Sequence, residues 1–121
     1  MLFRSLQYNE IKFDQDHIHP AVMFKPRNLR KLGLDDETIE KWIEMKDQLP
    51  NLQMMEERKN KVKNRTPFKE WIDTKTDSER KSYLKQNFIP DNGSFKLQEF
   101  DHFFEGRKRV LKKILIDTFI N

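Results

Sequence analysis

The end of the chain carries the longest periodic pattern in the sequence. Between residues 97 and 119, one set of positions recurs at the three- and four-residue spacing of an α-helix: Leu97, Phe100, Phe103, Phe104, Val110, Leu111, Ile114, Leu115 and Thr118. Gly106 weakens this pattern in its middle, because glycine costs about 1 kcal/mol relative to alanine inside a helix. The pattern predicts one long amphipathic helix, which needs other elements to cover its apolar side.

Shorter patterns upstream predict an α+β fold in which helices dominate. Apolar and polar residues alternate in part over residues 6–13, and an apolar run follows Pro50 at residues 51–55, so each predicts a strand of one small hairpin. Two helices are predicted between the strands. One begins at Pro26 and ends before Gly33, and the other begins after Asp35, where apolar residues recur at helical spacing. Further helices are expected over residues 57–64, after Thr66-Pro67, and after a capping box at residues 76–79.

The length and composition narrow the class of protein. A chain of 121 residues with 36% hydrophobic and 36% charged residues predicts one domain with a modest core. The chain has no cysteine, which excludes disulfides and thiolate zinc sites. No apolar window approaches the roughly 20 residues of a membrane span, and the first residues lack the pattern of a signal peptide. We therefore expect a cytoplasmic protein without a membrane partner.

Basic residues gather in two stretches of a chain whose net charge is only +4. One stretch covers residues 56–65 and contains Arg58, Lys59, Lys61, Lys63 and Arg65; the other covers residues 105–113. Two basic faces on a nearly balanced chain are typical of a polyanion site with defined edges. The alternative is that both stretches are ordinary solvated helix faces.

The densest group of chemically capable side chains is Asp14-Gln15-Asp16-His17-Ile18-His19-Pro20, at the end of the first predicted strand. An imidazole can take a proton from water near neutral pH, and a carboxylate can hold a hard cation such as magnesium. Both functions suit phosphodiester hydrolysis. Consecutive strand residues point to opposite faces, so Asp16 and His17 can share a site only if the chain turns there, and Pro20 favours such a turn. The alternative is a polar strand end with surface histidines.

A second group follows the predicted second strand. On a helix, Asn60, Lys63 and Asn64 share one face because they stand at positions i, i+3 and i+4. An amide oxygen there could complete a cation site, and the lysine could hold a phosphate. A solvated helix face is again the alternative.

Together the two groups resemble the ββα-metal, or HNH, nuclease motif. The matching residues are Asp16-His17-Ile18-x-Pro20, then Asn51-Leu52, then Asn60-Lys61-Val62-Lys63 nine positions after Asn51. The resemblance continues in Thr66-Pro67-Phe68-x-Glu70-Trp71 and in Phe100-x-x-Phe103-Phe104-Glu105-x-Arg107. Over nearly the whole chain it is similar to the C-terminal nuclease domain of GmrSD-like, modification-dependent restriction proteins.

The resemblance implies a role for each matched residue. His17 would be the general base that activates water, and Asp16 and Asn60 would bind one Mg²⁺ or Mn²⁺ ion. Asn51 would orient His17 or brace the loop between the strands. Lys63 would contact the scissile phosphate or its neighbour. The DNA backbone would be bound by Arg58, Lys61, Lys63 and Arg65.

The resemblance also implies a context. The chain would form one HNH endonuclease domain over residues 1–121, with its core motif at residues 6–65 and a helical part at residues 66–121. Double-stranded DNA would be the substrate and restriction of foreign DNA the role. A ParB-like nucleotide-binding domain would precede the nuclease domain or act as a partner chain, and two copies would pair to cut both strands.

Some positions depart from the pattern of the relatives. Pro50 stands where they usually carry glycine, and His19 stands where they carry an apolar or aromatic residue. We expect His19 to be exposed, with a second metal-site role as the alternative, and Asp14 to be supporting or structural. Asn64 could replace Asn60 as the ligand if the helix is rotated.

Two other functions compete with a nuclease. A DNA-binding or assembly module could keep the fold without cleaving, although the presence of all four motif residues argues against decay. A zinc hydrolase site could use His17-x-His19 with Asp14 or Asp16, but it lacks a third convincing ligand. DNA sequence preference, base modification and nicking versus double-strand cleavage lie outside what the sequence indicates.

Overall fold

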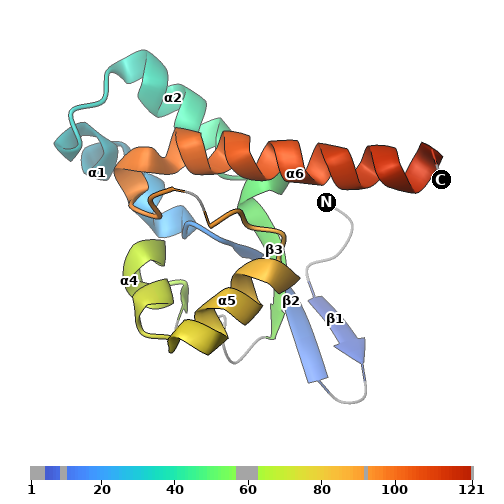
Figure 1. The fold of residues 1–121 in the computed structure, drawn as a ribbon. Helices are drawn as coiled ribbons and strands as arrows, with labels where there is room; N and C mark the ends of the chain where they lie inside the picture. Colours follow the sequence, from blue (N-terminus) through green and yellow to red (C-terminus); the bar gives the residue numbers. More distant parts are fainter. Residues whose placement is uncertain (1–4, 9–10, 57–62, 92, 121) are drawn as a thin grey trace.

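Three antiparallel strands form the sheet in the computed structural model, which describes all residues except 1–4, 9–10, 57–62, 92 and 121 (Figure 1). Strands β1 (Ser5–Tyr8), β2 (Ile11–His17) and β3 (Leu52–Glu56) lie in the order β1-β2-β3. The prediction of a single strand over residues 6–13 is wrong, because these residues fall in two antiparallel strands, β1 and β2. Strand β2 also continues to His17, which pairs with Leu52 of β3.

The connection between β2 and β3 is helical. It consists of a 3-10 turn η1 (Ala21–Phe24), helices α1 (Pro26–Lys31) and α2 (Asp36–Met45), and a second turn η2 (Leu49–Asn51). The predicted capping residue is confirmed: the Asp35 carboxylate accepts a hydrogen bond of 2.8 Å from the Thr38 backbone N–H. Gly33 lies just past α1 with a φ of 84°, a conformation that glycine adopts without the steric cost of a Cβ atom.

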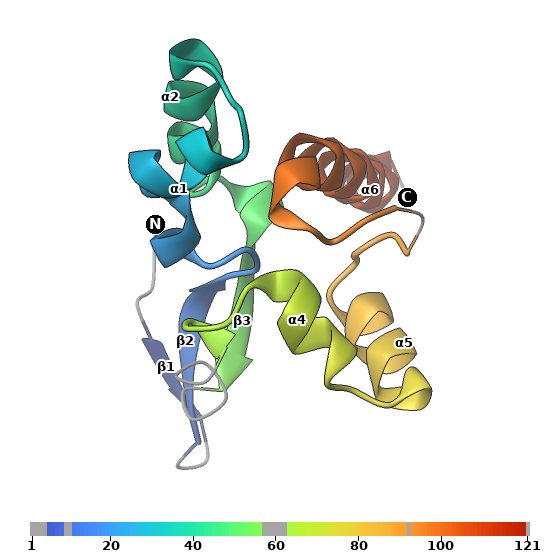
Figure 2. The same cartoon turned by 90° about the vertical axis from the view of Figure 1, so that its left-hand side faces the viewer.

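The second half of the chain is also helical. Helix α4 (Phe68–Asp73) is followed by α5 (Asp77–Gln86), a turn η3 (Leu97–Glu99) and the long helix α6 (Phe100–Ile120). The predicted capping box is confirmed at Thr76 and Glu79, and the predicted C-terminal helix is α6. Figures 1 and 2 both show α6 between the α1–α2 pair and the α4–α5 pair. The fold is thus mixed α+β and helix-dominated, as predicted.

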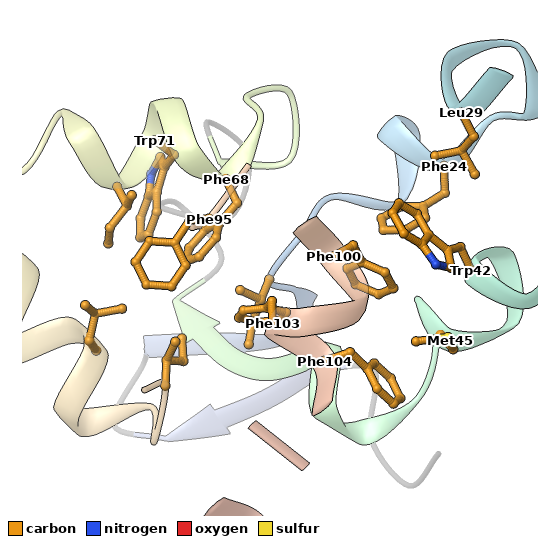
Figure 3. Packing of buried hydrophobic residues seen from close by; sticks show 14 of the residues in the cluster. Phe24, Leu29, Trp42, Met45, Phe68, Trp71, Phe95, Phe100, Phe103 and Phe104 are labelled. Carbon is orange, nitrogen blue, oxygen red and sulfur yellow. The ribbon is translucent and has the colours of Figure 1, made fainter. Parts of the chain in front are cut away.

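Aromatic side chains make up much of the core. Phe100 of α6 packs edge-on against Phe24 and Trp42, with ring centroids 4.7 and 5.4 Å apart. Figure 3 shows a second aromatic group around Phe68, with Phe103 between the two groups. Burial of each such side chain stabilises the fold by roughly 1.5–3 kcal/mol. This core fixes α6 and α4 around the end of β2, where the candidate site lies.

Within the part of the chain that the structure describes, we find no helix with the length and apolar character needed to cross a membrane.

Candidate functional site

The Asp16 carboxylate is buried near the end of β2, and its side chain is 0% exposed. Its Oδ2 atom accepts a hydrogen bond of 2.9 Å from the Gln53 amide and lies 3.1 Å from the Lys63 ammonium. Gln53 is the residue opposite Asp16 in the β2–β3 register. The strand pairing therefore sets one of the two donors that hold this carboxylate.

Lys63 is enclosed completely, and its Nζ atom has three acceptors. These are Asp16 Oδ2, the His17 carbonyl at 2.7 Å and the Ile18 carbonyl. Burial lowers the pKa of Lys63, and the neighbouring carboxylate opposes that shift. The role of phosphate contact predicted for Lys63 is corrected by this geometry, because all three N–H donors of an ammonium are directed into the protein.

The second oxygen of Asp16, Oδ1, is buried and has no hydrogen-bond partner among the residues that the structure describes. Buried carboxylate oxygens are costly to leave unpaired, and Mg²⁺ and Mn²⁺ prefer oxygen ligands. Asp16 Oδ1 therefore fits a hard cation, to which it would supply one ligand. No trio of His, Cys, Asp or Glu side chains in the described ranges is arranged to hold a metal ion. The predicted partner ligand Asn60 lies outside the described residues, as do Arg58 and Lys61.

Two residues behind Asp16, Gln53 and Tyr83, carry no signal in the sequence that marks them as site residues. The Tyr83 hydroxyl of α5 donates a hydrogen bond of 2.6 Å to Gln53 Oε1, and Gln53 in turn donates to Asp16. Burial raises the pKa of Tyr83, so this hydroxyl keeps its proton. Both residues stand in ordinary strand and helix patterns, which do not distinguish a core polar residue from a surface one.

His17 faces away from Asp16, as alternation along a strand requires. Its Nε2 atom lies 2.8 Å from Asp47 Oδ1, and its side chain is 30% exposed. Asp47 follows α2 and also accepts a hydrogen bond of 2.8 Å from Lys46. The turn that would have placed the Asp16 and His17 side chains on one face is not formed, because β2 continues through both residues.

The ionised state of Asp47 determines how His17 can act. Partial burial by itself would raise the pKa of Asp47, but hydrogen bonds from Lys46 and His17 outweigh it and lower that pKa. A carboxylate only accepts, so His17 Nε2 carries the hydrogen and Nδ1 is the basic nitrogen of the neutral imidazole. Asp47 is a second site residue that sequence reasoning missed, because it lies 30 positions from His17.

Asn51 is buried and braces the chain after β2. Its Oδ1 atom accepts a hydrogen bond of 2.8 Å from the His19 N–H, and its Nδ2 atom donates to the His19 and Lys46 carbonyls at 3.1 and 2.9 Å. The Asn51 backbone carbonyl also accepts a hydrogen bond of 2.8 Å from the Ile18 N–H. Of the two roles expected for Asn51, the geometry is that of a loop brace, and no bond from its side chain to His17 is formed.

Arg107 of α6 holds the segment around Asn51 from the other side. Its Nη1 atom donates to the carbonyls of Leu49, Pro50 and Leu52 at 3.1, 3.2 and 2.6 Å. Burial lowers the pKa of Arg107 to about 10. The first basic residue of the run at residues 105–113 is thus a buried structural arginine, which belongs to neither a DNA-binding face nor a solvated helix face.

His19 is buried, which corrects the expectation of an exposed histidine. Its ring makes edge contacts with Phe68, Phe100 and Phe103 at centroid distances of 5.2, 5.4 and 4.6 Å. Burial, with a smaller contribution from Lys63, lowers the pKa of His19 to about 3. The zinc site built on His17-x-His19 is not formed, because His19 is enclosed by phenylalanines while His17 contacts Asp47.

The remaining predicted residues have simple positions. Asn64 and Arg65 are exposed directly after Lys63. Asp14 lies in β2 opposite Met55. The structure describes no contact of Asn64 or Arg65 with Asp16 or His17, and the Asp14 side chain lies outside what it describes.

Comparison with protein-family models and with curated proteins finds no match for the chain. The geometry at the ends of β2 and β3 and the HNH resemblance of the motif residues therefore indicate the function.

Proposed function

We propose that this protein is a metal-dependent DNA endonuclease of the HNH type. The observation that carries the proposal is the pair of groups at the end of β2: a buried Asp16 carboxylate with one oxygen that has no hydrogen-bond partner among the described residues, and a half-buried His17 imidazole whose Nε2 is held by Asp47. Asn51 on the adjoining segment fixes the backbone beyond them. Order and spacing of these residues follow the ββα-metal motif.

His17 would act as the general base in this reaction. Its Nε2–H is held by Asp47, which fixes the ring orientation and leaves Nδ1 to take a proton from the attacking water. A carboxylate in this position also stabilises the imidazolium that forms after proton transfer. The remaining exposure of His17 gives water access to the ring.

Asp16 and, from the resemblance, Asn60 would hold the cation. Mg²⁺ or Mn²⁺ bound there would stabilise negative charge on the phosphate and on the departing oxygen. Asp16 and His17 lie on opposite faces of the strand, so the scissile phosphate would have to lie across the end of β2 to meet both groups. The same position leaves Lys63 beneath the site, where it neutralises Asp16.

Double-stranded DNA is the proposed substrate. Arg65 is exposed next to Lys63, and the resemblance adds Arg58 and Lys61 as further phosphate contacts. The same resemblance supports a role in restriction of foreign DNA, with a ParB-like nucleotide-binding domain in the same protein or in a partner chain. Cleavage of both strands would use two copies.

Metal dependence tests the proposal. Supercoiled plasmid is incubated with the protein and Mg²⁺, Mn²⁺, Zn²⁺ or EDTA, and nicked and linear products are measured. We expect cleavage with Mg²⁺ or Mn²⁺ and none with EDTA. Asn60→Ala should lose most of this activity, whereas Asn28→Ala, in α1, should retain it. Equal cleavage in EDTA, or none with any metal, would contradict the proposal.

One observation favours a second function, a DNA-binding or assembly module without cleavage. The Lys63 ammonium already neutralises Asp16, as expected of a motif that has become structural. This alternative predicts that the protein shifts plasmid fragments in a gel with EDTA present and never cuts them. Metal-dependent cleavage that is lost in Asn60→Ala would exclude it.

A further inference from the structure

Three side chains form a buried hydrogen-bonded series that ends on the proposed cation ligand. It begins at the Tyr83 hydroxyl, passes through the Gln53 amide and ends at Asp16 Oδ2, with distances of 2.6 and 2.9 Å. The members come from three elements, α5, β3 and β2. Gln53 and Asp16 are both nearly inaccessible, with 6% and 1% exposure.

The series has only one workable direction. An amide group has one acceptor end and one donor end, and a buried phenol hydroxyl has one proton to donate. Because a carboxylate only accepts, the Gln53 NH₂ group must face Asp16, and Oε1 then accepts from the Tyr83 hydroxyl. Rotation of the amide by 180° would turn Oε1 toward the carboxylate and lose the hydrogen bond to Asp16.

This direction decides which carboxylate oxygen stays open. Gln53 Nε2 and Lys63 Nζ both bind Oδ2, and within the described part of the chain Oδ1 has no hydrogen-bond partner. Two donors on one oxygen fix the rotation of the carboxylate about its χ2 bond. Asp16 is thereby held in one orientation with one defined unpaired oxygen, as a ligand of a hard cation requires.

We propose that Tyr83, acting through Gln53, is a positioning residue that presents Asp16 Oδ1 to a divalent cation. This inference rests on the proposed function, because it assigns the support behind the same metal ligand. Removal of the hydroxyl would free the Gln53 amide, and the carboxylate would then sample rotations in which neither oxygen is held open. Residues that orient metal ligands in this way typically change metal affinity 10- to 100-fold.

The test measures Mn²⁺ binding to the full chain without DNA, by the loss of the electron paramagnetic resonance signal of free Mn²⁺. Tyr83→Phe and Gln53→Met should each weaken Mn²⁺ binding about 10- to 100-fold. Tyr8→Phe makes the same change at a tyrosine of β1, outside this series, and should leave the affinity for Mn²⁺ unchanged. Leu84→Val disturbs the packing of α5 beside Tyr83 while it keeps the hydroxyl, so it separates loss of stability from loss of positioning.

The outcomes distinguish this inference from the proposed function. If the wild-type chain does not bind Mn²⁺, or if Asp16→Asn binds it equally well, both are overturned. If Asp16→Asn abolishes binding while Tyr83→Phe and Gln53→Met bind as the wild type does, the positioning role alone is overturned. An equal loss of affinity in Leu84→Val and Tyr83→Phe would also overturn it, because the effect would then follow stability.

Discussion

Substitution of Lys63 by methionine should destabilise the protein strongly. Methionine keeps much of the apolar stem that Lys63 packs near Phe68 and Trp71 but removes the ammonium, which lies 5.5 and 5.6 Å from those ring centroids. The Asp16 carboxylate would then remain buried with a single hydrogen bond, from Gln53. The His17 and Ile18 carbonyls would each lose a donor.

The expected loss follows from that count of broken interactions. Removal of one partner from a buried ion pair costs about 3–5 kcal/mol, because it leaves an uncompensated charge. Each carbonyl left unpaired adds to this cost, whereas release of the desolvated ammonium, whose pKa burial lowers, offsets part of it. We expect a net loss of about 3–5 kcal/mol, a large fraction of the roughly 5–15 kcal/mol typical of a domain.

Urea denaturation at pH 7 without metal, followed by tryptophan fluorescence, measures this loss. Lys69→Met is the matched control, since Lys69 forms a half-exposed pair with Asp73 and should cost less than about 1 kcal/mol. The double variant Asp16→Asn with Lys63→Met should cost less than the sum of its two single variants by more than about 1 kcal/mol. The buried pair would be refuted if Lys63→Met cost no more than Lys69→Met.

Three further predictions concern the residues around the site. Burial lowers the pKa of His19 from 6.5 to about 3, so below pH 6.5 only the unfolded chain takes up this proton and stability falls by about 1.4 kcal/mol per pH unit. His19→Leu should remove that part of the slope between pH 7 and 5.5, and an unchanged slope would contradict the burial of a neutral ring. Asn51→Asp should lower the free energy of unfolding in urea by more than about 2 kcal/mol, because an oxygen would replace an NH₂ group that faces two carbonyls. The exposed control Asn64→Asp should change it little. Equal effects of the two substitutions would contradict the role of Asn51 as a loop brace. Arg107→Lys should lower the melting temperature by several degrees more than Arg109→Lys, because a lysine cannot reproduce a guanidinium that contacts four carbonyls. Equal shifts would contradict the structural role of Arg107.

Local signals predicted the helices that the structure describes, whereas the helix predicted over residues 57–64 lies mostly outside the described residues. Asp35 and Thr76 cap helices where the sequence places them, because capping depends on residues three positions apart. The prediction of the first strand was wrong, because partial alternation over residues 6–13 does not show that the chain reverses between Tyr8 and Ile11. The alternation pattern is the same on either side of a tight reversal, so its period cannot mark the turn.

The candidate site was predictable in its motif residues but not in their partners. Asp16, His17 and Asn51 lie at the adjoining ends of β2 and β3, with the Asp16 and His17 side chains on opposite faces of the strand. Their partners were not predictable, because Asp47, Gln53 and Tyr83 lie about 30 or more positions from the groups that they bind. His19 shows the same limit. Its place near Asp16 and His17 at a strand end predicted exposure, whereas its surroundings in the fold are phenylalanines from α4 and α6.

The rate of plasmid cleavage by a His17 variant tests the proposed nuclease most directly. Conversion of supercoiled plasmid is followed over time with Mg²⁺ or Mn²⁺ for the wild type, His17→Ala and His102→Ala. His102 is exposed on α6, so its variant controls for loss of a histidine elsewhere. We predict that His17→Ala lowers the cleavage rate by about 10²- to 10⁴-fold, as expected for loss of a general base, while His102→Ala cleaves at the wild-type rate. Cleavage by His17→Ala at the wild-type rate would contradict the assignment of His17 as the base and, with it, the HNH mechanism.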